Sequence, residues 1–370
     1  MSNNCLSGKI FTEDGTFQEG VVTIENERIT RLEKKQDVPD YYILPGLVDV
    51  HFHGCAGHDF CEGTKEAMIA IAEYEERHGI TSICPATMTL AAEVLLNICE
   101  QAASVKKEIP SLVGINLEGP FLSYRKKGAQ NGTYLQKPDI NFLYELQKKA
   151  QGLIKLVAIA PEIEGAMACI EKCKNDFHFS IAHTEADYEE TSLALKAGAD
   201  HVTHLFNAMP VFGHRTPSVV GAAFDNEKTY VEVIGDGVHI HSSMIRSIFK
   251  LFGENRVVLI SDSMMATGMQ DGMYLLGGQD VIVKGNLATL VDGTIAGSAT
   301  NLYDCMVNVI SMGISPKMAI EAATINPAKS IGLDKEIGSI QVGKYADLLI
   351  VDKNYKLIKV VSKGKIIDLE

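Results

Sequence analysis

The sequence lacks both a long apolar segment and a recognisable export signal. No apolar run approaches the ~20 residues of a membrane-spanning helix. The first residues, MSNNCLSGKI, have no basic start followed by an apolar core, so no secretory signal is visible. We therefore expect a cytoplasmic protein that has no membrane partner.

Cysteine is present but forms no recognisable pattern. The eight cysteines are scattered along the chain, and none of their spacings matches a zinc finger. Cys169 and Cys173 stand four residues apart in a helical stretch, where both would pack on one face. This usage is typical of a reduced cytoplasm and indicates no disulfide framework.

Positive charge is scarce. The chain has 34 Lys and Arg residues against 47 Asp and Glu residues, and its formal net charge is −13. An acidic balance of this size argues against nucleic acid and against an anionic membrane surface as partners. Any anionic substrate would consequently need a local positive pocket.

The middle of the chain alternates between apolar strands and helical patterns. With 370 residues, of which 46% are hydrophobic, the chain can bury one large barrel and a smaller unit. Eight strand-like units separated mainly by helices predict a (β/α)₈ TIM barrel over residues 44–335. A β-hairpin insertion is expected near 273–295. The eight predicted strand segments are 47–50, 81–87, 111–120, 154–162, 177–186, 201–209, 229–239 and 256–263.

The two ends of the chain follow a different rhythm. Residues 1–43 and 336–370 contain short alternating segments with turn residues between them, a pattern typical of antiparallel strands. Two β-rich ends that flank a different middle predict that the termini meet. We therefore expect one small β-sandwich domain built from both of them.

A pair of histidines follows the first predicted barrel strand. His51 and His53 are two residues apart in LVDVHFHG. In an extended chain residues i and i+2 point to the same face, so both imidazoles can reach one point. Neutral imidazoles that converge in this way are suitable ligands for a divalent metal. The same spacing also arises by accident, with one histidine in a loop and the other in the core. Residues elsewhere in the chain are therefore needed to distinguish a metal site from this alternative.

Other polar residues stand at the ends of later strands. Glu118 ends the third in NLEGP, His183 the fifth in IAHTEA, His204 the sixth in VTHLF and Asp262 the eighth in ISDS. Any one of them could be a loop residue without a role. Catalytic groups of such barrels lie at the carboxyl ends of the strands, so their joint occurrence there favours a site. The N/O set suits zinc, iron(II), manganese or cobalt, and does not suit calcium.

Two further residues have competing interpretations. Asp262 could take a proton from metal-activated water and pass it to a leaving nitrogen, or it could cap the following segment. His239, in GDGVH, could bind substrate, or it could be a loop residue shaped by the two glycines. His201 precedes His204 by three residues, and this odd spacing points it to the opposite face of a strand. A surface or core position is expected for His58, His78, His178, His201, His214 and His241.

These motifs make the chain recognisable. The sequence resembles the amidohydrolase superfamily over nearly its whole length, and within it the N-acetylglucosamine-6-phosphate deacetylases. HxH and GKYADLLIVD are shared widely in the superfamily, whereas HLFNAMP with LEGPF and GDGVH is more specific to these deacetylases. The other matching segments are AHTEA, SDSM, AGS and NPAKSIGL. The resemblance implies hydrolysis of the N-acetyl group to acetate and glucosamine-6-phosphate, in amino-sugar catabolism and cell-wall recycling.

The resemblance also implies a divalent metal, zinc or iron(II), with one or two ions per subunit. Carried over by position, Glu118, His183 and His204 bind the core metal. His51 and His53 match the HxH pair that supports a second metal in some members and is degenerate in others. Because both histidines are present here, two metals are plausible, with Glu118 able to bridge them.

The remaining site residues are likewise implied by the resemblance. Asp262 matches the catalytic acid/base, which accepts the proton of the attacking water and delivers it to the departing amine. Asn207 and Ala208 match positions that hold the sugar phosphate, and His239 matches a substrate-binding histidine. Arg215, in GHRTP, matches a phosphate-binding arginine that the neighbouring subunit contributes, which implies a homodimer. The partner is thus a phosphorylated amino sugar, an anion that Arg215 and backbone N–H groups can bind. Lys126 and Lys127 lie close to the active loop in sequence. An exposed, solvated position is an equal alternative for both.

One position departs from the family pattern. In KKGAQN the family often has a histidine that polarises the acetyl carbonyl, and this chain has Gln130. A glutamine amide can donate a hydrogen bond to the substrate but cannot carry positive charge. A second metal could make that histidine dispensable.

Three alternative functions stay open. The first is the same reaction on N-acetylgalactosamine-6-phosphate, which the sequence separates poorly from the gluco epimer. The second is a cyclic-amide hydrolase or a deaminase, against which HLFNAMP and Arg215 speak because such substrates have no phosphate. The third is a catalytically silent barrel, which would be marked by lost metal ligands, whereas here every ligand position is filled.

Overall fold

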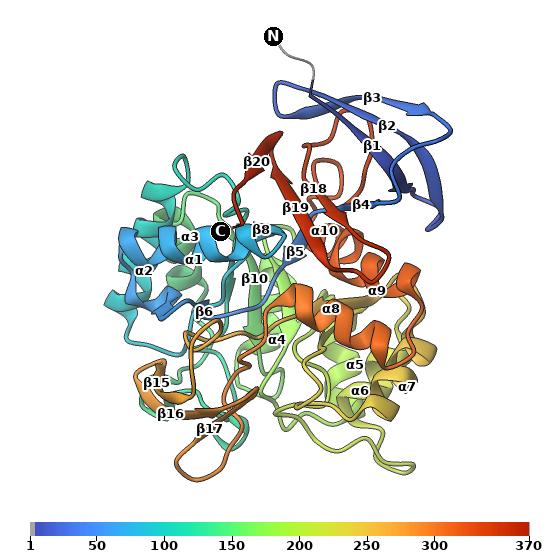
Figure 1. Ribbon diagram of the computed structural model, residues 1–370. Helices are drawn as coiled ribbons and strands as arrows, with labels where there is room; N and C mark the ends of the chain where they lie inside the picture. Colours follow the sequence, from blue (N-terminus) through green and yellow to red (C-terminus); the bar gives the residue numbers. More distant parts are fainter. Residues whose placement is uncertain (1–3, 370) are drawn as a thin grey trace.

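The computed structural model describes residues 4–369 (Figure 1), and eight of its parallel strands make up a barrel. Six of them form one sheet in the order β9-β10-β11-β12-β13-β14, and β5 pairs with β8. Parallel bridges at Ile83–Leu112 and Ala86–Asn116 join β8 to β9. The predicted TIM barrel is confirmed. Its strands are β5 (Leu47–Asp49), β8 (Ile80–Ile83), β9 (Ile115–Leu117), β10 (Ile154–Ile159), β11 (His178–Ile181), β12 (His201–Val202), β13 (Tyr230–Ile234) and β14 (Val257–Ile260).

The last gap in the barrel closes just beyond the strands. The backbone N–H of Asp262 donates to the carbonyl of His51 at 3.0 Å, and that of His53 donates to Ser263 at 2.7 Å. The strands are shorter than predicted; for example, the segment 201–209 contains only the two residues of β12. The chain leaves the ladder early because the residues after each strand turn into the loops that carry the polar groups.

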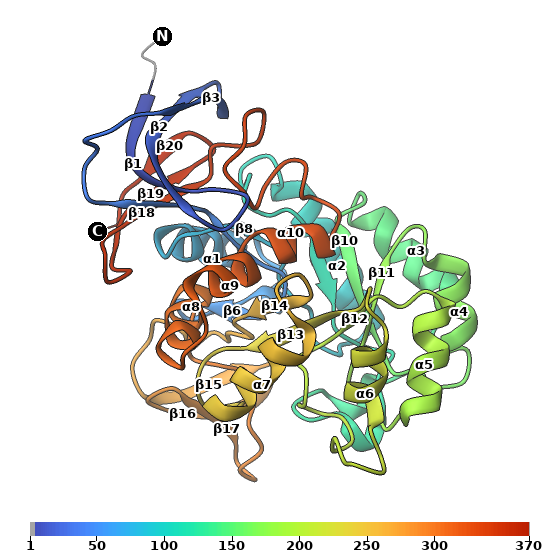
Figure 2. The same ribbon diagram turned by 90° about the vertical axis from the view of Figure 1, so that its right-hand side faces the viewer.

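A helix follows each barrel strand and covers the outside of the barrel (Figure 2). In α7, Ile245, Ile248, Phe249 and Phe252 are buried at helical spacing, and each stabilises the fold by about 1.5–3 kcal/mol. The helix ends at Gly253. The covering helices are α1 (Lys65–Arg77), α2 (Ala92–Val105), α3 (Ile140–Lys149), α4 (Ala166–Cys173), α5 (Tyr188–Ala197), α6 (Ser218–Asp225), α7 (Ser242–Phe252) and α8 (Leu302–Ser311).

Apolar packing fills the barrel at the amino ends of its strands. Ala328, Ile331 and Ile337 pack with Val48, Val258 and other inward-facing strand residues in one buried cluster. The side-chain amide of Asn326 donates to the carbonyl of Val257, at the start of β14. This packing closes the amino end and leaves the carboxyl end for a site. The closing helices are α9 (Pro316–Ala323) and α10 (Ile325–Ser330).

Strands from both termini form one seven-stranded mixed sheet, in the order β20-β19-β18-β4-β1-β2-β3 (Figure 1). The two ends meet where β4 pairs with β18, with Leu44 opposite Leu349. The small β domain predicted from both termini is confirmed: its sheet is continuous and curls back, so that Arg28 bridges to Tyr345 around a core of its own. The strands are β1 (Asn4–Phe11), β2 (Phe17–Glu25), β3 (Arg28–Lys34), β4 (Tyr42–Pro45), β18 (Leu348–Val351), β19 (Leu357–Ser362) and β20 (Lys365–Ile367). The domain boundaries at residues 44 and 335 stay a prediction.

Between β14 and α8 the chain forms a small antiparallel sheet beside the barrel mouth (Figure 1). The sequence predicts a hairpin there, and the structure has three strands because the turn at Gly285 adds a further pairing. They are β15 (Gly272–Leu276), β16 (Gln279–Lys284) and β17 (Leu287–Leu290). Short elements complete the chain: β6 (Gly54–Cys55), β7 (His58–Asp59), and 3₁₀ turns at Phe60–Glu62, Tyr124–Lys126 and Gly132–Tyr134.

The sequence expectation that Cys169 and Cys173 pack on one helix face is confirmed by this fold. Cys169 and Cys173 are both buried on α4, and all the cysteines, which lie within the described residues, are free. Over residues 4–369, every helix is too short or too polar to cross a membrane.

Candidate active site and metal centre

The predicted polar residues lie directly after barrel strands, at the same end of the barrel. Three of them, His183, His204 and Asp262, have left-handed backbone with φ of 42°, 29° and 49°. This conformation costs a residue with a side chain about 1–3 kcal/mol, and residues held in it cluster at functional sites. The strain thus marks the same strand ends that the sequence singles out.

Glu118, His183 and His204 form one buried triad. Oε1 of Glu118 lies 3.1 Å from Nε2 of His183 and 3.2 Å from Nε2 of His204, and the two Nε2 atoms are 3.1 Å apart. Ligands about 2.0–2.1 Å from a tetrahedral zinc lie about 3.3 Å from one another. The spacing of the three atoms therefore fits a single divalent ion.

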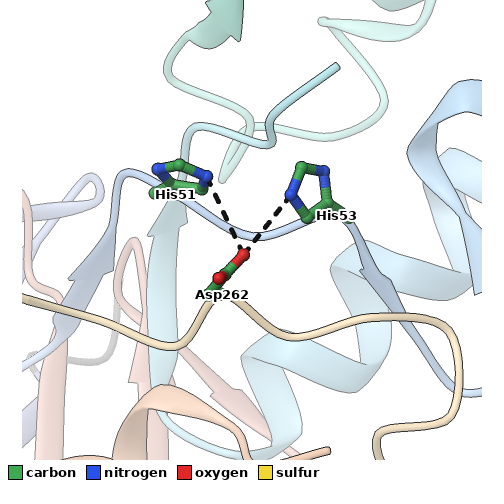
Figure 3. A group of neighbouring side chains, drawn as sticks. All are labelled: His51, His53 and Asp262. Carbon is green, nitrogen blue, oxygen red and sulfur yellow. Dashed lines mark ion pairs between the residues drawn. The ribbon is translucent and has the colours of Figure 1, made fainter. Parts of the chain in front are cut away.

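His51, His53 and Asp262 form a second triad (Figure 3). Oδ1 of Asp262 is 3.4 Å from Nε2 of His53 and 3.8 Å from Nε2 of His51. Glu118 contacts both groups, since its Oε2 is 3.4 Å from Nε2 of His53. The two oxygens of one carboxylate thus face two adjacent clusters of possible ligands.

The outer ring nitrogens of two of these histidines have fixed partners. Nδ1 of His51 lies 2.9 Å from Oε2 of Glu232, and Nδ1 of His183 lies 2.8 Å from the carbonyl of Lys126. With Nδ1–H as the donor, each Nε2 presents its lone pair to the cluster, as in carboxylate–histidine–metal sites. Nε2 of His51 is buried and has no hydrogen-bond partner among the described residues.

Glu232 is a residue that the sequence analysis missed. It is fully buried in β13, where the neighbouring side chains are apolar. An acidic side chain in a buried strand requires a partner, because an isolated buried charge is costly. The acid within TYVEVI is the only sequence signal that could have identified it.

Electrostatics keeps both carboxylates of the triads ionised. Burial would raise the pKa of Glu118, but the neighbouring charge of His51 and the hydrogen bonds with His183 and His204 hold it well below 4.5. Burial likewise opposes ionisation of Asp262, and its hydrogen bond with His53 lowers the pKa below 3.8. The site therefore offers anionic oxygen ligands at neutral pH.

A cavity of about 390 Å³ opens above the two triads. This volume suits a small-molecule ligand. The predicted substrate residues Gln130, Asn207, Ala208 and His239 line it, together with Arg125 and Lys126. Lys126 is half-buried, although the sequence allowed an exposed, solvated position equally well. The sequence analysis predicted no role for Arg125. Arg215 does not line this cavity and is exposed.

Two of the lining side chains are held in place by neighbours. Nδ1 of His239 lies 2.7 Å from Asp236, and although burial would lower the pKa of His239, this hydrogen bond raises it above 6.5. The amide of Asn207 donates to the carbonyl of His204 at 3.2 Å. Asp236 therefore holds the imidazole of His239 in place at one wall of the cavity.

Gln130 is almost fully buried, with 2% of its surface exposed. Its Oε1 accepts a hydrogen bond from the backbone of Thr89 at 2.7 Å, and its Nε2 donates to Oε2 of Glu118 at 2.7 Å. The predicted contact between Gln130 and the substrate stays a prediction.

A third histidine cluster lies at the opposite end of the barrel strands. The carboxylate of Asp200 accepts one hydrogen bond from Nδ1 of His178 at 2.6 Å and another from Nδ1 of His201 at 2.7 Å. These distances are those of charge-assisted hydrogen bonds and are shorter than the spacing of metal ligands. His201 thus stays outside the site, as its spacing from His204 predicts.

Comparison with known proteins agrees with this geometry. The model of the amidohydrolase family matches residues 42–367. The chain belongs to the amidohydrolase family. This family membership confirms the resemblance that the motifs predict.

Similar proteins include deacetylases named for either of the two epimeric phosphosugars. The amidohydrolase is 34% identical to N-acetylglucosamine-6-phosphate deacetylase of Bacillus subtilis (strain 168), over 96% of this chain and 95% of that one. It is 29% identical to N-acetylgalactosamine-6-phosphate deacetylase of Escherichia coli O157:H7, over 99% of both chains.

Solved structures show the same architecture. A mutant N-acetylglucosamine-6-phosphate deacetylase of Mycobacterium smegmatis, in complex with N-acetylglucosamine-6-phosphate, has a TM-score of 0.93 and 30% identity, covering 99% of this chain and 100% of that one. The deacetylase of Thermotoga maritima has a TM-score of 0.92 and 30% identity, covering 99% of both chains. The amidohydrolase thus combines this fold with buried His, Asp and Glu clusters suited to a divalent metal.

Proposed function

We infer that this amidohydrolase hydrolyses the N-acetyl group of N-acetylglucosamine-6-phosphate to acetate and glucosamine-6-phosphate. The observation that carries this conclusion is the pair of buried triads that meet at Glu118 below a cavity. Full-length similarity to deacetylases of this substrate supports it. The reaction belongs to amino-sugar catabolism and cell-wall recycling, in the cytoplasm.

We propose that Glu118, His183 and His204 hold one divalent ion, zinc or iron(II). His51 and His53 would hold a second ion, with Glu118 shared between the two. Such a metal supplies Lewis acidity, which lowers the pKa of water and polarises a carbonyl. The buried Nε2 of His51, which has no hydrogen-bond partner among the described residues, and the ionised Glu118 support this assignment.

In this proposal Asp262 handles the proton. Its carboxylate is ionised, lies 3.4 Å from Nε2 of His53 and lines the cavity, where it would face an attacking water. Asp262 takes the proton of that water as the C–O bond to the acetyl carbon forms. It then gives the proton to the amine nitrogen as the C–N bond breaks, so that acetate and a free amine leave.

The phosphate of the substrate requires positive groups, since the chain as a whole carries a charge of −13. We propose that His239, Asn207 and the backbone at Ala208 bind the sugar phosphate within the cavity. Arg215 is exposed outside the cavity of its own chain, which favours a homodimer in which it reaches the neighbouring site. Arg125 and Lys126 extend the positive wall.

The test compares the two epimers. Acetate release is measured for N-acetylglucosamine-6-phosphate and N-acetylgalactosamine-6-phosphate at matched concentrations, with unphosphorylated N-acetylglucosamine as the control. We expect the gluco epimer to have the highest kcat/KM and the unphosphorylated sugar the lowest. The full-length similarity to an N-acetylgalactosamine-6-phosphate deacetylase makes the galacto epimer the second candidate. A higher kcat/KM for that epimer would transfer the assignment to it.

A further inference from the structure

The amide of Gln130 is occupied at both ends by the protein. Its Oε1 accepts from the backbone N–H of Thr89, and one N–H of its Nε2 points at Oε2 of Glu118, both at 2.7 Å. The sulfur of Met88 lies 3.7 Å from the same nitrogen. Because Gln130 is 2% exposed, little of this amide can reach a ligand in the cavity.

The surroundings fix which end of the amide is which. A flipped amide would place its N–H groups against the N–H of Thr89 and its oxygen against the carboxylate of Glu118. Both contacts would be repulsive, because a backbone N–H only donates and an ionised carboxylate only accepts. The hydrogen bond from Gln130 to Glu118 is therefore set by the backbone at Thr89.

The segments that follow two neighbouring strands approach each other closely around this amide. A Cβ atom at Gly119 would lie only 2.2 Å from the hydroxyl of Thr89, and Gly119 has φ of +88°. Glu118 and Thr89 thus follow neighbouring strands at a close approach that only glycine permits. Gln130 joins these two strand ends from a third segment.

We propose that Gln130 is a positioning residue that holds Glu118 in the orientation shared by the two triads. This inference rests on the proposed metal-dependent function. The oxygen that Gln130 contacts, Oε2, is the one that faces His53 at 3.4 Å, while Oε1 faces His183 and His204. The amide thereby fixes the oxygen directed at the second triad, and it does so in place of polarising the acetyl carbonyl.

Zinc binding by the metal-free protein tests this role without any substrate. In Gln130→Met the side chain keeps its length but loses both hydrogen bonds. We expect calorimetric titration with zinc to give affinity about 10- to 100-fold weaker than in the wild type, the usual effect of removing a group that orients a metal ligand. Gln136→Met, at an exposed position of the same segment, should bind zinc as the wild type does.

Turnover at saturating zinc separates positioning from substrate contact. If Gln130 acts through Glu118, excess zinc restores most of the kcat of Gln130→Met. Unchanged zinc affinity, with or without a lower kcat at saturating zinc, would overturn the proposal. Gln130→Asn gives a second measurement, because its shorter amide cannot span Thr89 and Glu118 and should also weaken zinc binding. If the wild type failed to release acetate, only the proposed substrate would be overturned. The zinc titration would still test the role of Gln130.

Discussion

Glu232 Oε2 lies 2.9 Å from Nδ1 of His51, and both side chains are fully buried inside the barrel. On the other side of the same ring, Nε2 lies 3.5 Å from Oε1 of Glu118. Burial would lower the pKa of His51, but the charges of Glu118 and Glu232 raise it well above 6.5. Glu232 thus orients the imidazole and increases its basicity from within the core.

Glu232→Gln should weaken zinc binding by about 10- to 100-fold, because the neutral amide orients His51 less firmly and makes its Nε2 less basic. Competition with a chelator measures this affinity directly. The exposed neighbour provides a control, since Glu227→Gln makes the same chemical change outside the core and should have no effect. Equal zinc affinity in both variants would show that Glu232 has no part in the metal site.

Asp262→Asn should lower kcat by about 10²- to 10⁴-fold, the usual contribution of a general acid–base group. Because the hydrogen bond with His53 lowers the pKa of Asp262 below 3.8, the wild-type base is ionised at neutral pH. Initial rates of acetate release against pH should therefore show no acid limb from this residue near neutrality. A variant that retains most of its activity would remove Asp262 from the proton-transfer step.

Glu75→Gln should stabilise the protein at alkaline pH. Glu75 is buried on α1, and burial together with the charge of Asp49 raises its pKa from 4.5 to about 8. The folded state must keep a proton that the unfolded state loses, so the stability of the wild type falls as pH rises from 4.5 to about 8. Gln carries no such penalty, and at about pH 9 we expect it to gain about 1–3 kcal/mol.

Urea unfolding at about pH 5 and about pH 9 measures this difference. The advantage of Glu75→Gln should be large at the higher pH and nearly absent at the lower one. Glu66→Gln, exposed on the same helix, should show no such growth with pH. A Glu75→Gln advantage that does not change with pH would mean that the carboxyl group is not titrating in the buried state.

Mixing two inactive variants tests whether Arg215 serves the neighbouring subunit. Arg215→Ala should bind the phosphosugar poorly, and Asp262→Asn should turn it over poorly. If the arginine acts across a homodimer, a hybrid dimer has one intact site, and random mixing restores about a quarter of the sites. No recovery after unfolding and refolding the two variants together would show that Arg215 acts within its own chain or not at all.

The barrel and most of the site could be predicted from the sequence because their signals are local. Apolar strands alternating with helices predict the fold, and polar residues at strand ends such as His183 and Asp262 stand out against apolar neighbours. Their convergence follows from the barrel geometry alone. The structure brings together those predicted positions for which one residue type and one strand end suffice.

Other features depend on contacts between distant segments and could not be predicted. Glu232 and His51 are far apart in sequence, and nothing local indicates that they share a hydrogen bond. The engagement of Gln130 by Thr89 depends on a close approach of two strand ends. The strand order of the curled terminal sheet likewise follows from pairing across the termini, which alternation alone does not specify.

The most direct test of the account is acetate release from N-acetylglucosamine-6-phosphate by protein that has been stripped of metal and then reloaded with zinc or iron(II). We predict that the reloaded protein releases acetate and free amine in equal amounts, and that the stripped protein releases neither. A folded protein that binds the metal and still releases no acetate would contradict the proposed reaction. Acetate release that persists without metal would contradict the role assigned to the two triads.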